Sequence, residues 1–226
     1  MYRYSLISLI LVVLSCNSNG QNQKISDVSN PQKNQKNMQN IDLKVWKEKA
    51  NEYQKNINEE GEVISTNPKY YFFQEEKNNI LYEFSGDDSE GFSLIETKKE
   101  PNIYSDVNFY RNDGHLLYSF STLTINPKIV IGEHLEYNED GKIVKRIDYD
   151  DGFVRTPQEI VTFIKSNKGE VFHELTIIDR NKTNGKSFWH VEFLNTKTKN
   201  VEIYELDDQN LQILSKQERD SDFLAD

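Results

Sequence analysis

The chain has one cysteine, Cys16, among its 226 residues. A single cysteine cannot form an intramolecular disulfide, so the fold must be held together by packing. The chain also lacks a long hydrophobic run. Its most apolar stretch, Leu6–Leu14, has nine residues, about half of the roughly 20 that a helix needs to cross a membrane. This stretch is too short to serve as a spanning anchor.

Familiar catalytic signatures are missing too. The sequence contains no Gly-x-Ser-x-Gly motif, no glycine-rich dinucleotide fingerprint and no phosphate-binding loop ahead of Gly185-Lys186-Ser187. Cys16 lies at the end of the apolar run, where it predicts an anchor rather than a nucleophile. We therefore expect a protein that is not an enzyme and needs no cofactor.

Metal-ligand patterns are incomplete. His134 with Glu136 and His190 with Glu192 stand two apart, a spacing that strand alternation produces often. A calcium-type loop beginning at Asp148 has its glycine at the wrong position, and Pro157 interrupts it. We expect neither a zinc nor a calcium site.

The N-terminus resembles a lipoprotein signal peptide. Residues 1–15 contain one cation, Arg3, then the apolar run, then a small residue before Cys16. Val13-Leu14-Ser15-Cys16 resembles a bacterial lipobox, which implies cleavage before Cys16 and acylation of its sulfur, with attachment to a membrane. The alternative is an ordinary signal peptide followed by a chance cysteine.

Residues 16–41 are rich in Asn, Gln, Ser and Lys and poor in apolar side chains, a composition typical of a flexible tether. No acidic run follows Cys16. In some Gram-negative bacteria such a run marks export to the outer face. Its absence favours an outer-membrane lipoprotein that faces the periplasm.

The region 42–154 begins with a predicted helix. Asp42 is a suitable N-cap, and apolar residues then recur every three or four positions up to Ile57, before Gly61. We expect this amphipathic helix to dock through Trp46 on the protein's own sheet. A helix that binds a partner or a membrane surface is the alternative.

Short β-type runs follow. Tyr70–Phe73 and Ile80–Phe84 predict a hairpin around a polar turn at 74–79, and Asp113-Gly114 and Asp140-Gly141 predict two more hairpins. The two phrases Tyr110-x-x-Asp113-Gly114-x-Leu116 and Tyr137-x-x-Asp140-Gly141-x-Ile143 resemble the MORN-like repeats of bacterial antitoxin-type proteins, which form open rows of hairpins.

The region 155–217 predicts a helix followed by three to four strands. Thr156-Pro157-Gln158-Glu159 has the features of a capped helix start, and Gly169 of its end. Strands are expected at 171–178, 187–194, 201–206 and 211–214, with a tail at 218–226. This order resembles a PepSY domain, a non-catalytic envelope module, which implies a binding or peptidase-restraining role. The predicted fold class is α+β, mostly antiparallel hairpins and meander.

Charge is the remaining guide to partners. The chain holds 27 basic and 37 acidic residues, a net charge of −10. This balance argues against nucleic acid and favours a basic protein partner, such as a toxin or a peptidase. The candidate contact residues lie in four acidic turns: Asp87, Asp88, Glu90, Asp113, Glu139, Asp140, Asp150 and Asp151. We expect an immunity-type lipoprotein that neutralises a periplasmic toxin, with a structural or assembly lipoprotein as the alternative.

Overall fold

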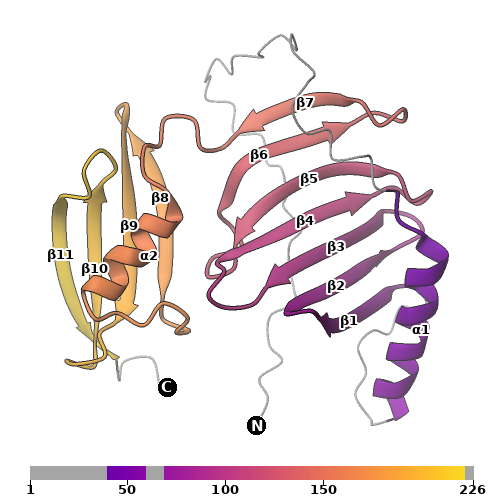
Figure 1. Cartoon of the computed structure of the whole chain (residues 1–226), viewed down its shortest axis with the longest axis horizontal. Helices are drawn as coiled ribbons and strands as arrows, with labels where there is room; N and C mark the ends of the chain where they lie inside the picture. Colours follow the sequence, from indigo (N-terminus) through magenta and orange to yellow (C-terminus); the bar gives the residue numbers. More distant parts are fainter. Residues whose placement is uncertain (1–39, 60–68, 222–226) are drawn as a thin grey trace. The chain divides into compact units, whose positions relative to one another are not determined.

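The structure, a computed structural model, describes residues 40–59 and 69–221, with the side chains of 56–59 left out. Cys16 and the predicted signal peptide and tether up to residue 39 lie outside the described residues, as do Gly61 and the side chain of Ile57. Two helices and two antiparallel sheets form in the described part (Figure 1), which confirms the predicted α+β class.

Helix α1 (Leu43–Glu59) begins at the predicted cap. The Asp42 carboxylate accepts hydrogen bonds from the backbone N–H groups of Lys44 and Val45 at 3.1 and 3.3 Å. The Trp46 ring then packs 5.5 Å from Phe84, measured between ring centroids. The helix therefore docks on the protein's own sheet.

Seven strands follow in a continuous meander, in which each strand pairs with the next along the chain. Their bounds are β1 (Tyr71–Lys77), β2 (Ile80–Asp87), β3 (Gly91–Lys98), β4 (Tyr104–Tyr110), β5 (Leu116–Leu123), β6 (Val130–Tyr137) and β7 (Ile143–Asp148). Both Asp-Gly hairpins are present, as β4–β5 and β6–β7.

The first hairpin differs from its prediction. Residues 74–77 continue β1, and the turn contains only Asn78 and Asn79, at φ of 54° and 63°. Asparagine tolerates this left-handed conformation, so a two-residue turn is enough. The polar residues before the turn belong to β1 and pair with β2; the Gln74 side chain, for example, donates to Glu83 at 2.8 Å.

Helix α2 (Pro157–Ser166) begins with the predicted capping box, in which Thr156 and Glu159 bond reciprocally. The second sheet has the order β11-β10-β9-β8. Its strands are β8 (Ile177–Thr183), β9 (Lys186–Leu194), β10 (Asn200–Asp207) and β11 (Ile213–Asp220).

Two predictions in this region are wrong. The strand expected from 171 begins only at Ile177, because Val171 inserts into the core beside α2 and the next residues turn. The last strand, expected to end near 214, runs on to Asp220, into the predicted tail, because it pairs with β10 as far as Asn200.

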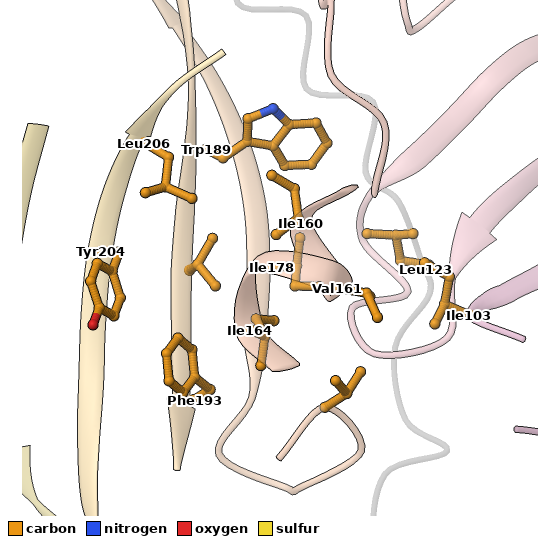
Figure 2. Close-up of a cluster of buried hydrophobic side chains, with 12 residues drawn as sticks. Ile103, Leu123, Ile160, Val161, Ile164, Ile178, Trp189, Phe193, Tyr204 and Leu206 are labelled. Carbon is orange, nitrogen blue, oxygen red and sulfur yellow. The ribbon is translucent and has the colours of Figure 1, made fainter. Parts of the chain in front are cut away.

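Two clusters of buried apolar side chains hold these elements. One joins α1 to β1–β5 and contains Ala50, Phe73, Phe84, Phe92, Leu94, Tyr110 and Leu116. The other lies between α2 and the second sheet, and takes in Ile103, which directly precedes β4, and Leu123 of β5 (Figure 2). Trp189, Phe193 and Tyr204 are its largest members.

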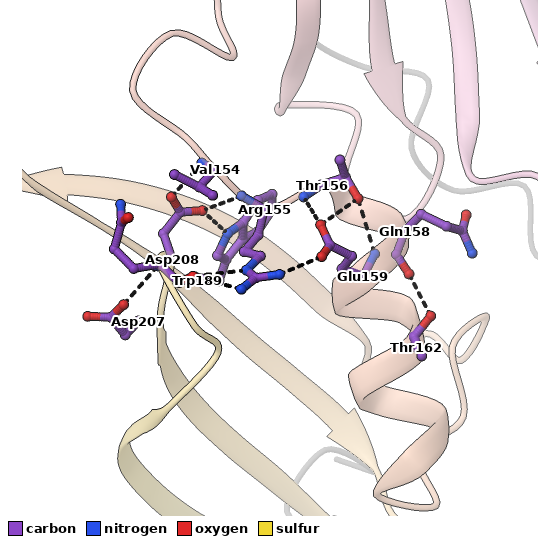
Figure 3. A network of polar contacts seen from close by, with 10 residues as sticks. Val154, Arg155, Thr156, Gln158, Glu159, Thr162, Trp189, Asp207 and Asp208 are labelled. Atoms are coloured by element: carbon purple, nitrogen blue, oxygen red, sulfur yellow. Dashed lines mark hydrogen bonds and ion pairs between the residues drawn. The ribbon is translucent and has the colours of Figure 1, made fainter.

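A buried carboxylate ties the segment before α2 to the second sheet (Figure 3). Asp208 is 0% exposed and accepts hydrogen bonds from the backbone N–H of Val154 at 2.6 Å, the backbone N–H of Arg155 at 3.1 Å and the indole N–H of Trp189 at 2.8 Å.

Among the described helices, none is both long and apolar enough to cross a membrane.

Candidate functional site

Three of the four acidic turns lie at one end of the meander. In an antiparallel meander every second connection falls at the same end, and this end holds the β2–β3, β4–β5 and β6–β7 turns. Side chains link the turns. The Asn112 amide donates to the Asp88 carbonyl at 3.4 Å, and the Arg111 guanidinium donates to the Tyr137 carbonyl at 2.9 Å. We call this surface the acidic end: Asp87, Asp88, Glu90, Asp113, Glu139 and Asp140.

Half of these carboxylates maintain the fold. Asp87 accepts from the Ser89 hydroxyl and from the N–H groups of Ser89 and Glu90, and these hydrogen bonds lower the pKa of its carboxyl. Asp113 accepts from the His115 N–H, which likewise lowers its pKa. Asp88 forms an ion pair with Lys47 of α1.

The other three, Glu90, Glu139 and Asp140, carry carboxylates with no hydrogen bond or ion pair to the described residues. The fourth predicted turn is not part of this surface. Asp150 and Asp151 follow β7 at the opposite end of the sheet, where Arg180 binds the Asp150 carboxylate at 2.7 Å and Lys182 donates to the Asp151 carbonyl.

A row of stacked rings begins next to the acidic end and crosses the sheet. Phe109 stacks on Tyr118 with centroids 4.9 Å apart and planes 8° apart, and Phe120 stacks on His134 at 5.4 Å and 4°. Tyr118 and His134 lie 5.6 Å apart, which joins the two pairs. Tyr149, at 6.5 Å from His134, continues the row. We call these five side chains the aromatic ladder.

The aromatic ladder lies on the face opposite α1. Side chains alternate between faces along a strand, and Tyr110, the neighbour of Phe109, packs in the α1 cluster with Phe92. Four of the ladder side chains are half-buried, and Tyr149 is 41% exposed. No described helix packs on this row of rings.

Glycine at position 91 leaves room for the Phe109 ring, the first ring of the ladder. A Cβ there would stand 3.0 Å from the Phe109 ring and 2.5 Å from the Tyr110 carbonyl oxygen, and Gly91 has φ of 104°. The ring of Phe109 therefore lies over the place where any other residue would project.

The His134 and Tyr118 rings of the ladder are uncharged at neutral pH. Burial lowers the pKa of His134, and Lys145 adds to this effect, although the charge of Glu136 opposes it. Burial also raises the pKa of Tyr118. Two charged side chains border the row, Glu136 and Lys145, and they pair with each other at 2.7 Å. The ladder can therefore contact a partner through flat apolar rings without burying an unpaired charge.

Sequence patterns did not identify this surface. Phe109, Tyr118, Phe120 and His134 come from three strands, and only the register brings them together. The available signal was the alternation Tyr118-x-Phe120, with serine at 119 and 121, which places two rings on one face.

The described residues include no group of three His, Cys, Asp or Glu side chains that could hold a metal ion. The two His–Glu pairs do form contacts within the chain. His134 lies 3.7 Å from Glu136, and His190 contacts Glu192 at 2.9 Å and Glu205 at 2.7 Å. Arg219 occupies the other oxygen of Glu192 at 2.6 Å.

Comparison with known proteins found no match to this chain among family models, curated proteins or solved structures. The likeness to MORN-like repeats and to the PepSY domain therefore stays a prediction. The candidate site rests on the geometry of the acidic end and the aromatic ladder.

Proposed function

We propose that this chain is a non-catalytic, lipid-anchored binding protein of the cell envelope, which docks a basic protein on its aromatic ladder. The observation that carries the proposal is the row of five rings, from Phe109 to Tyr149, on a face that no described helix covers. Four of these rings are half-buried and Tyr149 is 41% exposed, and a row of rings that stays partly accessible on a folded protein is typical of an interaction site.

Rigid aromatic side chains suit a protein interface. They offer a large contact area and lose little conformational entropy on binding, so they often dominate the binding energy. Stacking already fixes the ladder rings, for example Phe120 on His134 at 5.4 Å. A partner would therefore meet a preorganised surface.

The acidic end supplies a reason to expect a basic partner. Glu90, Glu139 and Asp140 have carboxylates that no described side chain neutralises, and they lie at the end of the meander where the ladder begins with Phe109. Charges at the rim of an interface steer encounter and add salt dependence more than they add final affinity. We therefore expect binding to weaken as salt is raised.

The biological role that fits these features is immunity. A lipid on Cys16 and a tether up to residue 41 would hold the body near a membrane, where it could bind and block an incoming toxin.

Replacing Cys16 tests the proposed lipid anchor: Cys16→Ser should release the protein from the membrane fraction. Full retention of the variant with membranes would show that Cys16 is not the anchor.

A competition assay tests the role itself. A deletion strain is grown with its parent, and is complemented with the wild type, with Phe120→Ala, with Tyr149→Ala, or with the control Ile213→Ala on β11, where Ile213 is 47% exposed. We expect the deletion strain to be killed, and the control but not the ladder variants to restore resistance.

Thermal melting of each purified variant separates unfolding from lost binding, and Tyr149→Ala matters most because its side chain is already exposed. If the deletion strain resists its siblings as well as the parent does, the immunity role is wrong and a structural or assembly lipoprotein becomes the better account. If both ladder variants protect fully while folded, the ladder is not the docking face.

A further inference from the structure

A hollow of about 580 Å³ lies at the end of the meander away from the acidic end. The β1–β2 turn and the β3–β4 connection form one side of it, and the outer face of α2 forms the other. Gln158 and Lys165 both line it, and they are two helical turns apart on one face of α2. Small-molecule sites occupy roughly 300–1,000 Å³, so the hollow has the size of a ligand site.

The charge of the hollow is opposite to that of the chain. Lys98, Lys99 and Lys165 line it, and no aspartate or glutamate does, although the chain carries a net charge of −10. Two of these ammonium groups are paired with carboxylates, so Lys165 supplies most of the local positive potential, which favours an anion.

At least one of these lysines is available to a ligand. Lys165 has no ion pair with any described residue. Lys98 and Lys99 pair with Asp106 at 3.6 Å and Glu76 at 2.5 Å, but both lysine side chains are 48% exposed. Exposed ion pairs contribute little free energy, so an anionic ligand can replace them.

The remaining lining combines amides with an apolar floor. Asn102 uses its side-chain oxygen to accept from the Tyr104 N–H at 2.9 Å, which leaves its NH₂ group to donate. Gln158 adds a second amide, and the half-buried Ile80 and Tyr104 form apolar surface. Burial, with the charge of Asp150, raises the pKa of Tyr104, so its hydroxyl stays protonated.

We propose that this hollow binds an anionic saccharide, a sugar-sized molecule that carries a carboxylate or a phosphate group. The lysines would bind the anionic group, the amides of Asn102 and Gln158 would bind hydroxyls, and the Tyr104 ring would contact the sugar face. A bare inorganic anion would use only the lysines and leave most of the volume empty. The proposal is independent of the aromatic ladder, which lies on another part of the sheet.

NMR titration of the full-length protein in detergent tests the proposal. The probes are glucuronate, glucose 6-phosphate, neutral glucose and inorganic phosphate. We expect saturable shifts at Gln158, Lys165 and Asn102 with the two anionic sugars, and much weaker binding of the other two probes. Glucuronate against glucose 6-phosphate shows whether the carboxylate or the phosphate is preferred.

Two variants connect the shifts to the hollow. Lys165→Gln should weaken sugar-anion binding about tenfold, which equals the loss of about 1.4 kcal/mol for a charged hydrogen bond. Lys197→Gln, an exposed lysine outside the hollow, should leave it unchanged. The proposal is wrong if the sugar anions give no saturable shifts, or if glucose or inorganic phosphate binds as tightly as they do. It is also wrong if Lys165→Gln leaves the binding of the sugar anions unchanged.

Discussion

At the scale of single residues, Asp208 shows how a buried charge can be stabilising here. Its carboxylate has no exposure to water, and three N–H donors compensate for the lost hydration. Two of the donors belong to the backbone ahead of α2, so this carboxylate also fixes where that helix begins (Figure 3).

Removing this acceptor should be costly. Asp208→Ala leaves the buried Trp189 indole N–H and two part-buried backbone N–H groups without this acceptor, and we expect a loss of about 3 kcal/mol in the free energy of unfolding. Asp208→Asn keeps one accepting oxygen and should lose less. Chemical denaturation measures both, with the exposed Asp151→Ala as the control. An Asp208→Ala variant as stable as wild type would contradict the assigned role.

The two histidines should give opposite pH dependences. For His190, burial lowers the pKa, but hydrogen bonds and charge from Glu192 and Glu205 outweigh it, so the folded pKa lies above 6.5. Its stabilising effect is present below pH 6.5 and is lost as pH rises through the folded pKa. For His134 the folded pKa lies below 6.5, so stability falls as pH drops through that value.

Unfolding free energies of the wild type, His190→Gln and His134→Gln at about pH 5.5 and about pH 8.5 test these signs. The wild type should exceed His190→Gln by more at the lower pH, and should exceed His134→Gln by more at the higher pH. If the differences in unfolding free energy do not change with pH, or change in the reverse direction, the pKa shifts assigned to His190 and His134 are wrong.

At the scale of elements, α1 is held to the sheet by aromatic side chains, Trp46 and Tyr53. Trp46 lies 5.5 Å from Phe84 and 5.9 Å from Phe73, both in the buried cluster. Trp46→Ala should cost ~3 kcal/mol, the usual range for a large aromatic in a core. Val45→Ala, one residue away and 44% exposed, should change little. Equal melting temperatures for the two variants would mean that the helix is not docked.

The sequence predicted those elements whose signals are local. The Asp-Gly turns at Gly114 and Gly141 and the Thr156–Glu159 capping box depend on a few neighbouring residues, and each forms as expected. Signals that depend on the tertiary structure were harder to interpret. Gly169 was predicted to end α2, and the helix does end before it, at Ser166, but the left-handed residue there is Lys168, at φ of 63°.

Gly169 is instead required by packing. A Cβ there would come within 2.4 Å of both Ile164 and Phe193, a contact that no local pattern predicts. The aromatic ladder was not predicted for the same reason, because Phe120 and His134 come together only through the register of β5 and β6. The predicted contact residues do lie at turns. The sequence could not show which of their carboxylates would accept hydrogen bonds from the backbone of their own turn.

At the scale of the whole molecule, the net charge of −10 is an average over unlike surfaces. One end of the meander presents Glu90, Glu139 and Asp140, and the other end presents a hollow lined by lysines. Between them, on the face opposite α1, lies the uncharged ladder. The proposed basic partner and the proposed anionic ligand would therefore bind to different parts of the body.

Photo-crosslinking in the producing cells tests the central claim, that another protein docks on the ladder, most directly. A photoreactive phenylalanine replaces Tyr149, which is 41% exposed at the end of the ladder, or Ile213, which is 47% exposed on β11. Cells are irradiated during competition with their siblings. The account predicts a covalent adduct with a second protein at position 149 and none at 213. No adduct at 149, a crosslink only within the chain, or equal adducts at both positions would contradict it.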